Sequence, residues 1–255
     1  MKKKAKSELT SEEMAISMRL REMKMSGMAD AFEQQILDPN ADLTPFAERL
    51  GNLVNTEWQM RYNKKLNRLL KQAKLRYPSA DLDESIYEAD RKLDHQSIEK
   101  LAGCEWIDEG RNLLITGMTS SGKTYLSNAL CVSAIRKLKT VRYMKASRLM
   151  LELEQARIKD TYLEVLTNLT VKTDLLAIDD FGLMELDLDK CRDLFEVIDG
   201  RDGRHSTIII SQFPVKTWFD MFKDGTYADA CLSRLTDKRH SYRIEMNGRS
   251  MRDPV

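Results

Sequence analysis

Residues 117–124 have the types and spacing of a phosphate-binding loop. They read Gly-Met-Thr-Ser-Ser-Gly-Lys-Thr and match the pattern GxxxxGK[ST]. Glycines at both ends allow a turn so tight that backbone N–H groups point at phosphate oxygens, and a following helix adds positive potential there. Lys123 is suited to neutralise the β- and γ-phosphates, and the Thr124 hydroxyl to ligate magnesium. We therefore predict ATP and Mg²⁺ as cofactors, with contacts from Gly117, Met118, Thr119, Ser120, Ser121, Gly122, Lys123, Thr124 and Tyr125.

An acidic pair, Asp179 and Asp180, ends a second apolar run. Ligands of parallel sheets collect at the carboxyl ends of strands, where Lys123 and Thr124 are also expected. We predict that Asp179 holds the magnesium together with Thr124, and that Asp180 is the general base for the attacking water. The alternative is that both acids merely begin a loop and cap the next element of the chain.

The elements around these residues follow two patterns. From residue 111 onward, short β-rich runs alternate with helical stretches, which predicts an α/β fold with a parallel sheet and helices on both faces. The runs are 112–116, 141–145, 174–179, 207–212 and 242–246. A helix at 125–138 after the first run gives the phosphate loop its required context and argues against a chance match.

Residues 8 to about 100 instead have helical composition, interrupted by prolines. We predict helices at 11–25, 27–37, 44–76 and 83–101, the first begun by Thr10 with Glu13 three residues on. The predicted domains are a helical N-terminal domain, 1–105, for DNA, partner or oligomer contacts, and an ATPase domain, 106–255.

Composition narrows the class of protein. The 255 residues are 42% hydrophobic and carry a net charge of +1, so total charge does not speak for or against nucleic acid. No apolar run approaches the roughly 20 residues of a membrane span, and no apolar segment follows the basic N-terminus. Four cysteines without a CxxC and only three histidines argue against a zinc site and predict reduced thiols in a cytoplasmic protein.

The order of motifs resembles AAA+ ATPases of the initiator and loader clade. Over nearly all of the chain it resembles IstB-like helper ATPases of insertion-sequence transposases, with DnaC-type helicase loaders as nearest relatives. The telling stretches are 117–124, 175–182 (LLAIDDFG), 207–214 (TIIISQFP), 227–235 (YADACLSRL) and 249–252 (RSMR). The first two are shared widely among ATPases, and the last three are far more selective. The resemblance implies a five-stranded AAA+ sheet in which the strand at 207–211 lies between the phosphate-loop strand and the Asp179 strand. Asp180 stands where the class usually has Glu, which is one methylene longer.

The resemblance also implies three polar groups around the nucleotide. Gln212, or less favourably Ser211, would be the sensor near the γ-phosphate, although an ordinary turn at the end of a strand fits as well. Arg234 would be an arginine finger inserted by a neighbouring subunit, which requires a homo-oligomer; a surface or intrasubunit salt bridge is the alternative. Arg204 is a weaker candidate for the finger. Arg252 would contact the nucleotide from the C-terminal end, where a frayed tail is an equally good interpretation.

One stretch could bind a phosphate backbone. Residues 58–80 contain seven basic residues and no acid, and most of the cations fall on one helical face with leucines and Ala73 behind. A solvated face, or one packed on an acidic partner, is the alternative. The resemblance adds residues 145–172, where Arg157, Lys159 and Lys172 are secondary candidates. The main candidates for DNA contact are Arg61, Lys64, Lys65, Arg68, Lys71, Lys74 and Arg148. The aromatic residues Trp58, Tyr62 and Tyr77 are expected in the core, and stacking on the bases of a single strand is the alternative.

Together these features predict an ATP-dependent, DNA-binding helper of an insertion-sequence transposase. It would assemble on duplex DNA with ATP and hydrolyse ATP at subunit interfaces to control target selection. The expected partners are double-stranded DNA, the transposase and further copies of the chain. The alternatives are a helicase loader that acts on single strands, a nucleotide-gated scaffold with little turnover, and a small-molecule kinase, for which no acceptor pocket is recognisable.

Overall fold

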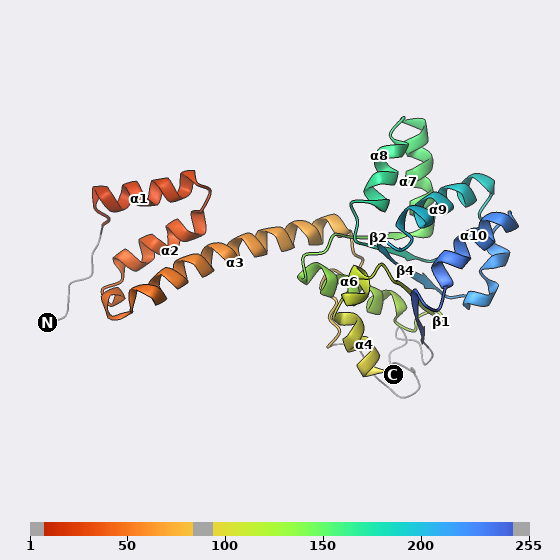
Figure 1. Ribbon diagram of the computed structural model, residues 1–255, viewed down its shortest axis with the longest axis horizontal. Coiled ribbons are helices and arrows are strands. Elements are labelled where there is room, and N and C mark those ends of the chain that lie inside the picture. The colour runs from red at the N-terminus through yellow and green to blue at the C-terminus, as the bar shows by residue number, and fades with distance from the viewer. Residues whose placement is uncertain (1–7, 84–93, 247–255) are drawn as a thin grey trace. The chain divides into compact units, whose positions relative to one another are not determined.

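The computed structural model describes residues 8–83 and 94–246, and the chain divides into two compact units. The units are Met1–Asn67 and Arg68–Val255. They divide at a different place from the domain boundary expected at residues 105 and 106, which stays a prediction from the sequence. Figure 1 shows the helical N-terminal unit and the sheet-containing unit.

The first unit consists of helices. They are α1 (Ser11–Glu22), α2 (Ser26–Leu37), the short η1 (Ala41–Leu43) and the first part of α3 (Phe46–Ala73). Thr10 Oγ1 accepts a hydrogen bond from Glu13 N at 3.3 Å, while Thr10 N donates to Glu13 Oε2 at 2.8 Å. This reciprocal pair satisfies two backbone N–H groups at the start of α1, and confirms the predicted helix start. Arg21 joins α1 to α2 through Asp30 at 2.7 Å and Glu33 at 2.9 Å.

The second unit is built on a five-stranded sheet. Its strands are β1 (Asn112–Gly117), β2 (Val141–Lys145), β3 (Leu175–Asp179), β4 (Ser206–Ser211) and β5 (Ser241–Met246). The order is β2-β3-β4-β1-β5, and every neighbouring pair is parallel. The expected place of β4, between β1 and β3, is confirmed. Each predicted run lies within one or two residues of a strand. The runs of β1, β3 and β4 are aliphatic and buried, as expected for strands covered on both faces.

Helices cover both faces of this sheet (Figure 1). One face packs on α6 (Lys123–Arg136), and the other lies under α7 (Ala146–Ile158), α8 (Tyr162–Thr170), α9 (Leu188–Arg201) and α10 (Gly225–Thr236). Strand side chains alternate between the faces. Leu114, Met144, Leu176, Ile178 and Ile209 join the core formed with α7–α10. Their neighbours along each strand therefore face α6.

The remaining elements are short or lie before the sheet. They are α4 (His95–Ala102), α5 (Glu105–Asp108), η3 (Val215–Thr217) and η4 (Phe219–Met221). The helix expected at 83–101 is partly outside the described residues, and α4 accounts for its last part. All four cysteines are buried free thiols. Among the described residues, no helix has both the length and the apolarity needed to cross a membrane.

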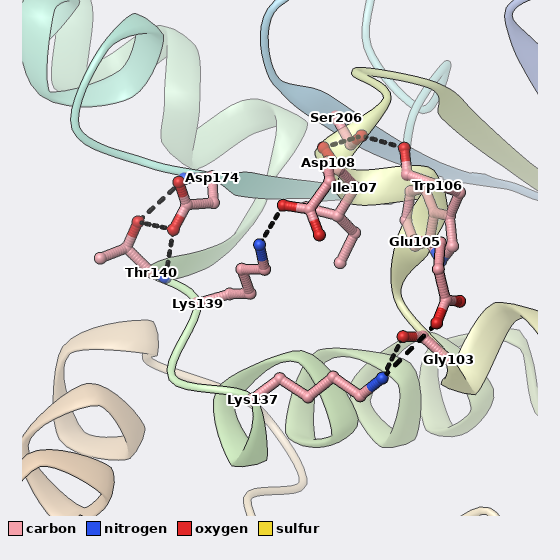
Figure 2. A network of polar contacts seen from close by, with 10 residues as sticks. All are labelled: Gly103, Glu105, Trp106, Ile107, Asp108, Lys137, Lys139, Thr140, Asp174 and Ser206. Carbon is pink, nitrogen blue, oxygen red and sulfur yellow. Dashed lines mark hydrogen bonds and ion pairs between the residues drawn. The ribbon is translucent and has the colours of Figure 1, made fainter.

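A polar network holds the edge of the sheet where the strands begin (Figure 2). Asp174 Oδ2 accepts from Thr140 N and Thr140 Oγ1, both at 2.7 Å, which joins the starts of β2 and β3. Lys139 pairs with Asp108 of α5, and Ser206 Oγ donates to Trp106 O at 3.2 Å. These contacts are structural, and the opposite edge, at the strands' carboxyl ends, carries the predicted site.

Candidate nucleotide-binding site

The predicted phosphate loop leaves the carboxyl end of β1 and enters α6 at Lys123. Gly117 has φ +141°, and a Cβ there would lie 2.0 Å from Met246 O of β5, so no other residue fits. Gly122, with φ +92°, is the residue before the first turn of α6. The loop therefore has the tight backbone and the helix N-terminus that a phosphate cradle requires.

Lys123 is the positive charge of the loop. Its Nζ donates to Met118 O at 2.6 Å and lies 3.5 Å from Ser121 Oγ. Burial lowers its pKa, and the nearby Asp179 and Asp180 oppose that shift. A buried ammonium held inside the loop is suited to binding a polyanion, because its interaction with the phosphates is stronger there than that of an exposed lysine would be.

Asp179 is the most constrained residue of the site. It ends β3 and is only 2% exposed. Its Oδ2 accepts from Thr124 Oγ1 at 2.9 Å and from Tyr143 OH at 2.5 Å, and its Oδ1 accepts from Asp180 N at 2.8 Å. The structure therefore brings together Thr124 and Asp179, the two residues predicted to hold magnesium.

This pair of oxygen ligands fits Mg²⁺ bound with a nucleotide. Mg²⁺ typically takes one or two carboxylates from the protein and completes its shell with phosphate oxygens and waters. Within the described ranges no group of three or more His, Cys, Asp or Glu side chains could hold a metal ion by itself. The predicted site thus depends on nucleotide oxygens, as expected for a phosphate loop.

Asp180 adopts a left-handed conformation, with φ +56°, which an aspartate tolerates better than most residues. Its Oδ2 lies 2.6 Å from Nζ of Lys145, the last residue of β2. From the sequence, Lys145 only begins a segment with possible DNA contacts, and its place beside the acidic pair is missed. The signal that finds it is positional: β2 and β3 run in parallel register with Lys145 beside Asp179.

The two sensor candidates, at the end of β4, have different contacts. Gln212 Oε1 accepts a hydrogen bond from Thr119 Oγ1 of the phosphate loop at 2.8 Å. Ser211 is buried, and its hydroxyl donates to Phe181 O at 2.6 Å and accepts from Phe213 N at 3.0 Å. The geometry favours Gln212, the residue preferred from the sequence, because Ser211 is used to shape the loop after β3.

Tyr125 lies just past the loop and turns to a different neighbour. Its hydroxyl accepts from Asp81 N at 3.2 Å, and its ring lies 5.9 Å from that of Tyr77. Asn128 on the same helix accepts from Tyr77 N at 3.1 Å. These contacts fasten the segment after α3 onto α6. A nucleotide contact from Tyr125 stays a prediction.

Arg234 lies in the last turn of α10. Its guanidinium pairs with Asp199 of α9 at 2.8 Å and lies over the Phe195 ring, 5.2 Å from the centroid. Asn112 Nδ2, at the beginning of β1, donates to Arg234 O at 3.3 Å, so Arg234 lies at the opposite end of β1 from the chain's own phosphate loop. The intrasubunit salt bridge given as an alternative is present, and delivery to a neighbour stays a prediction. Arg204 is exposed in its turn, and Arg252 lies outside the described residues.

The basic residues of α3 are mostly exposed. Arg61 pairs with Glu57 at 2.6 Å and donates to Lys24 O at 3.0 Å, so this cation is engaged within the first unit. Leu69 and Ala73 are buried, as predicted for the back of the helix. The prediction of a core position was wrong for Tyr77, which is exposed, and for Trp58, which is 62% exposed and stacks on Tyr62 at 5.5 Å. The other exposed candidates are Lys64, Lys65, Arg68, Lys71 and Lys74.

A groove of about 360 Å³ beside the edge strand β2 brings together candidates from distant parts of the sequence. Lys74, the residue after α3, and Arg148, from α7, both line it, together with Arg142 and Lys145. Glu152 is the acid in the lining, and it pairs with Arg142 at 3.1 Å. Of the secondary candidates, Lys159 and Lys172 are exposed, whereas Arg157 pairs with Asp193 of α9.

Comparison with known proteins agrees with this geometry. The family model described as IstB-like ATP binding protein matches residues 18–254. An insertion-sequence ATP-binding protein of Sinorhizobium fredii is 39% identical over 234 residues, covering 92% of this chain and 94% of that protein. The ATP-binding protein of insertion sequence IS1162 from Pseudomonas fluorescens is 40% identical over 198 residues, or 78% and 85% of the two chains.

Solved structures show the same fold. The crystal structure of the DnaC helicase loader superposes with a TM-score of 0.57 at 18% identity, covering 68% of this chain and 99% of that one. AMPPCP-bound DnaA from Aquifex aeolicus gives 0.55 at 19% identity, covering 66% and 50%. The sheet order, the phosphate loop and the extent of the family match lead to one conclusion: the chain has an AAA+ fold and belongs to the IstB-like ATP binding protein family.

Proposed function

We propose that this protein is an Mg²⁺-dependent ATPase that binds duplex DNA and assists an insertion-sequence transposase. The observation that carries the ATPase part is the contact between Thr124 and Asp179, 2.9 Å apart, with Asp180 as the next residue. A phosphate loop alone supports nucleotide binding. A second acid beside the metal-binding pair adds a group that can take a proton.

In this proposal each residue of the site has a defined role. The loop N–H groups and Lys123 bind the β- and γ-phosphates, and Thr124 and Asp179 would hold Mg²⁺, which supplies charge neutralisation on the phosphates. Gln212 orients the attacking water from the end of β4. Asp180 accepts the proton of that water once its carboxylate is released from Lys145. Arg234 of a neighbouring subunit would stabilise the charge that develops on the transferred phosphoryl group.

The DNA part is supported by the groove beside β2. Lys74 and Arg148 are predicted as DNA contacts from separate parts of the sequence, and they line one basic groove with Arg142 and Lys145. Basic side chains without base-reading geometry favour contacts with phosphates and shape rather than sequence. The relatives' association with insertion sequences supports the transposase as partner.

The test is steady-state ATP turnover with and without duplex DNA, at low and at moderate salt. We expect duplex DNA to stimulate turnover and salt to weaken the stimulation, because counterion release drives the contacts. Lys123→Ala should abolish nucleotide binding, whereas Asp180→Asn should retain it and lose turnover. Single-stranded DNA of equal length is the control. Stimulation by single strands alone would favour the loader alternative, and turnover indifferent to any DNA would contradict the proposal.

A further inference from the structure

A tyrosine on the edge strand contacts the carboxylate predicted to hold magnesium. Tyr143 lies on β2 and is 7% exposed, and its hydroxyl donates to Asp179 Oδ2 at 2.5 Å. Met144, the next residue, belongs to the core on the other face of the sheet. Because strand side chains alternate, Tyr143 points to the face that packs on α6, where Thr124 also lies.

We propose that Tyr143 is a positioning residue that holds the carboxylate of Asp179 in the orientation that binds Mg²⁺. The proposal rests on the proposed function, and it assigns a role to a residue outside the phosphate loop and the acidic pair.

The geometry explains why a second donor is needed. The terminal torsion of an aspartate is broad, so the carboxylate plane is set by its partners rather than by its rotamer. Thr124 and Tyr143 both donate to Oδ2, and Asp180 N donates to Oδ1. Without the Tyr143 hydroxyl, Asp179 Oδ2 would accept a hydrogen bond from Thr124 alone, whose hydroxyl is also predicted to bind the metal. Groups that orient a metal-binding carboxylate from behind govern metal affinity even though they do not touch the metal.

The phenol is suited to this role because a metal-binding carboxylate only accepts hydrogen bonds, so the Tyr143 hydroxyl is the donor. A hydrogen bond to an ionised acceptor is of the strong, charge-assisted kind.

The chain contains a matched control. Tyr162 OH donates to Asp193 Oδ1 at 2.9 Å, and Asp193 is also buried, at 4% exposed. This tyrosine–aspartate pair joins α8 to α9 and includes none of the predicted nucleotide-site residues. Tyr143→Phe and Tyr162→Phe remove the same atom and the same kind of bond, so a general loss of stability should appear in both variants.

The experiment measures ADP affinity by calorimetry over a range of Mg²⁺ concentrations and in EDTA. We expect Tyr143→Phe to need about tenfold more Mg²⁺ than wild type for the half-maximal gain in affinity. Affinity in EDTA should stay unchanged, and Tyr162→Phe should follow the wild-type curve. In an Asp179→Asn background, Tyr143→Phe should have no further effect, because the two residues act together.

Two results would overturn the role of Tyr143 while leaving the proposed function intact. If Tyr143→Phe follows the wild-type Mg²⁺ curve, or shifts it no more than Tyr162→Phe does, the tyrosine is only structural. If its effect persists in full with Asp179→Asn, it does not act through that carboxylate. A wild type whose ADP affinity is indifferent to Mg²⁺ would instead remove the metal assignment, and with it both the proposed function and this inference.

Discussion

Lys145 Nζ lies 2.6 Å from Asp180 Oδ2, so the acid proposed as the general base has a counter-ion from the neighbouring strand. Both side chains are partly exposed, at 51% and 37%, and the pair is therefore open to competition from solvent and from other anions. Lys145 also lines the groove beside β2. A phosphate bound there would compete with Asp180 for the same ammonium group.

Loss of this ion pair should raise turnover in the absence of DNA. Exposed pairs contribute up to about 1 kcal/mol, so freeing Asp180 in Lys145→Gln should increase basal ATP turnover by up to about fivefold. DNA stimulation should shrink in the same proportion. Lys223→Gln, which removes the Lys223–Glu185 pair at 3.0 Å, is the matched control and should change neither rate. A basal rate that falls in Lys145→Gln would mean that the lysine orients the base rather than restrains it.

Gln212 should affect the chemical step and not nucleotide binding. Its side chain lies 2.8 Å from Thr119 Oγ1, and its amide group is the proposed donor to the attacking water. Removing one preorganised donor typically costs about 10²-fold in kcat, which is the loss expected for Gln212→Ala. ATP affinity, measured with an inactive Asp180→Asn background, should stay the same. A variant with normal kcat and weakened binding would remove the sensor assignment.

DNA affinity should depend on Lys74 and Arg148 through charge alone. Each phosphate contact contributes about one unit to the slope of log affinity against log salt, so Lys74→Ala and Arg148→Ala should each lower the slope by about 1. The loss should be the same for unrelated duplex sequences. Lys216, an exposed lysine outside the groove lining, is the control position. If Lys216→Ala lowers the slope as much as the groove variants do, the groove has no special part in binding.

Much of the sheet and of the phosphate loop could be predicted from the sequence, for a physical reason. The strands that form the centre of the sheet are continuous aliphatic runs, and the loop motif has fixed backbone requirements at Gly117 and Gly122. The strand order was implied by the family resemblance, not by periodicity. Contacts within a few residues, such as Thr10 with Glu13, follow from local chemistry alone.

Contacts between strands were harder to predict, because register is set by the whole sheet. Tyr143 and Lys145 are two residues apart on β2, and their partners Asp179 and Asp180 lie at the end of β3 and directly after it. Nothing in the local sequence marks a tyrosine or a strand-end lysine as part of a nucleotide site. Arg201 is a similar case: it is 1% exposed and donates to Thr173 O at 2.9 Å and to Thr207 Oγ1 at 3.0 Å. From the sequence, only its exposed neighbour Arg204 was singled out, as a candidate for the arginine finger, and the buried contacts of Arg201 were not predicted.

In the proposed function, one subunit supplies Asp180 and its neighbour supplies Arg234 to the same active site. The most direct measurement mixes two inactive variants, Asp180→Asn and Arg234→Ala, and follows ATP turnover on duplex DNA. Random head-to-tail assembly pairs an intact acid with an intact arginine at about one interface in four, so turnover should recover to about a quarter of the wild-type rate. Each variant alone should stay inactive while binding ATP. A mixture as inactive as its components, or an Arg234→Ala variant that is active alone, would contradict the account.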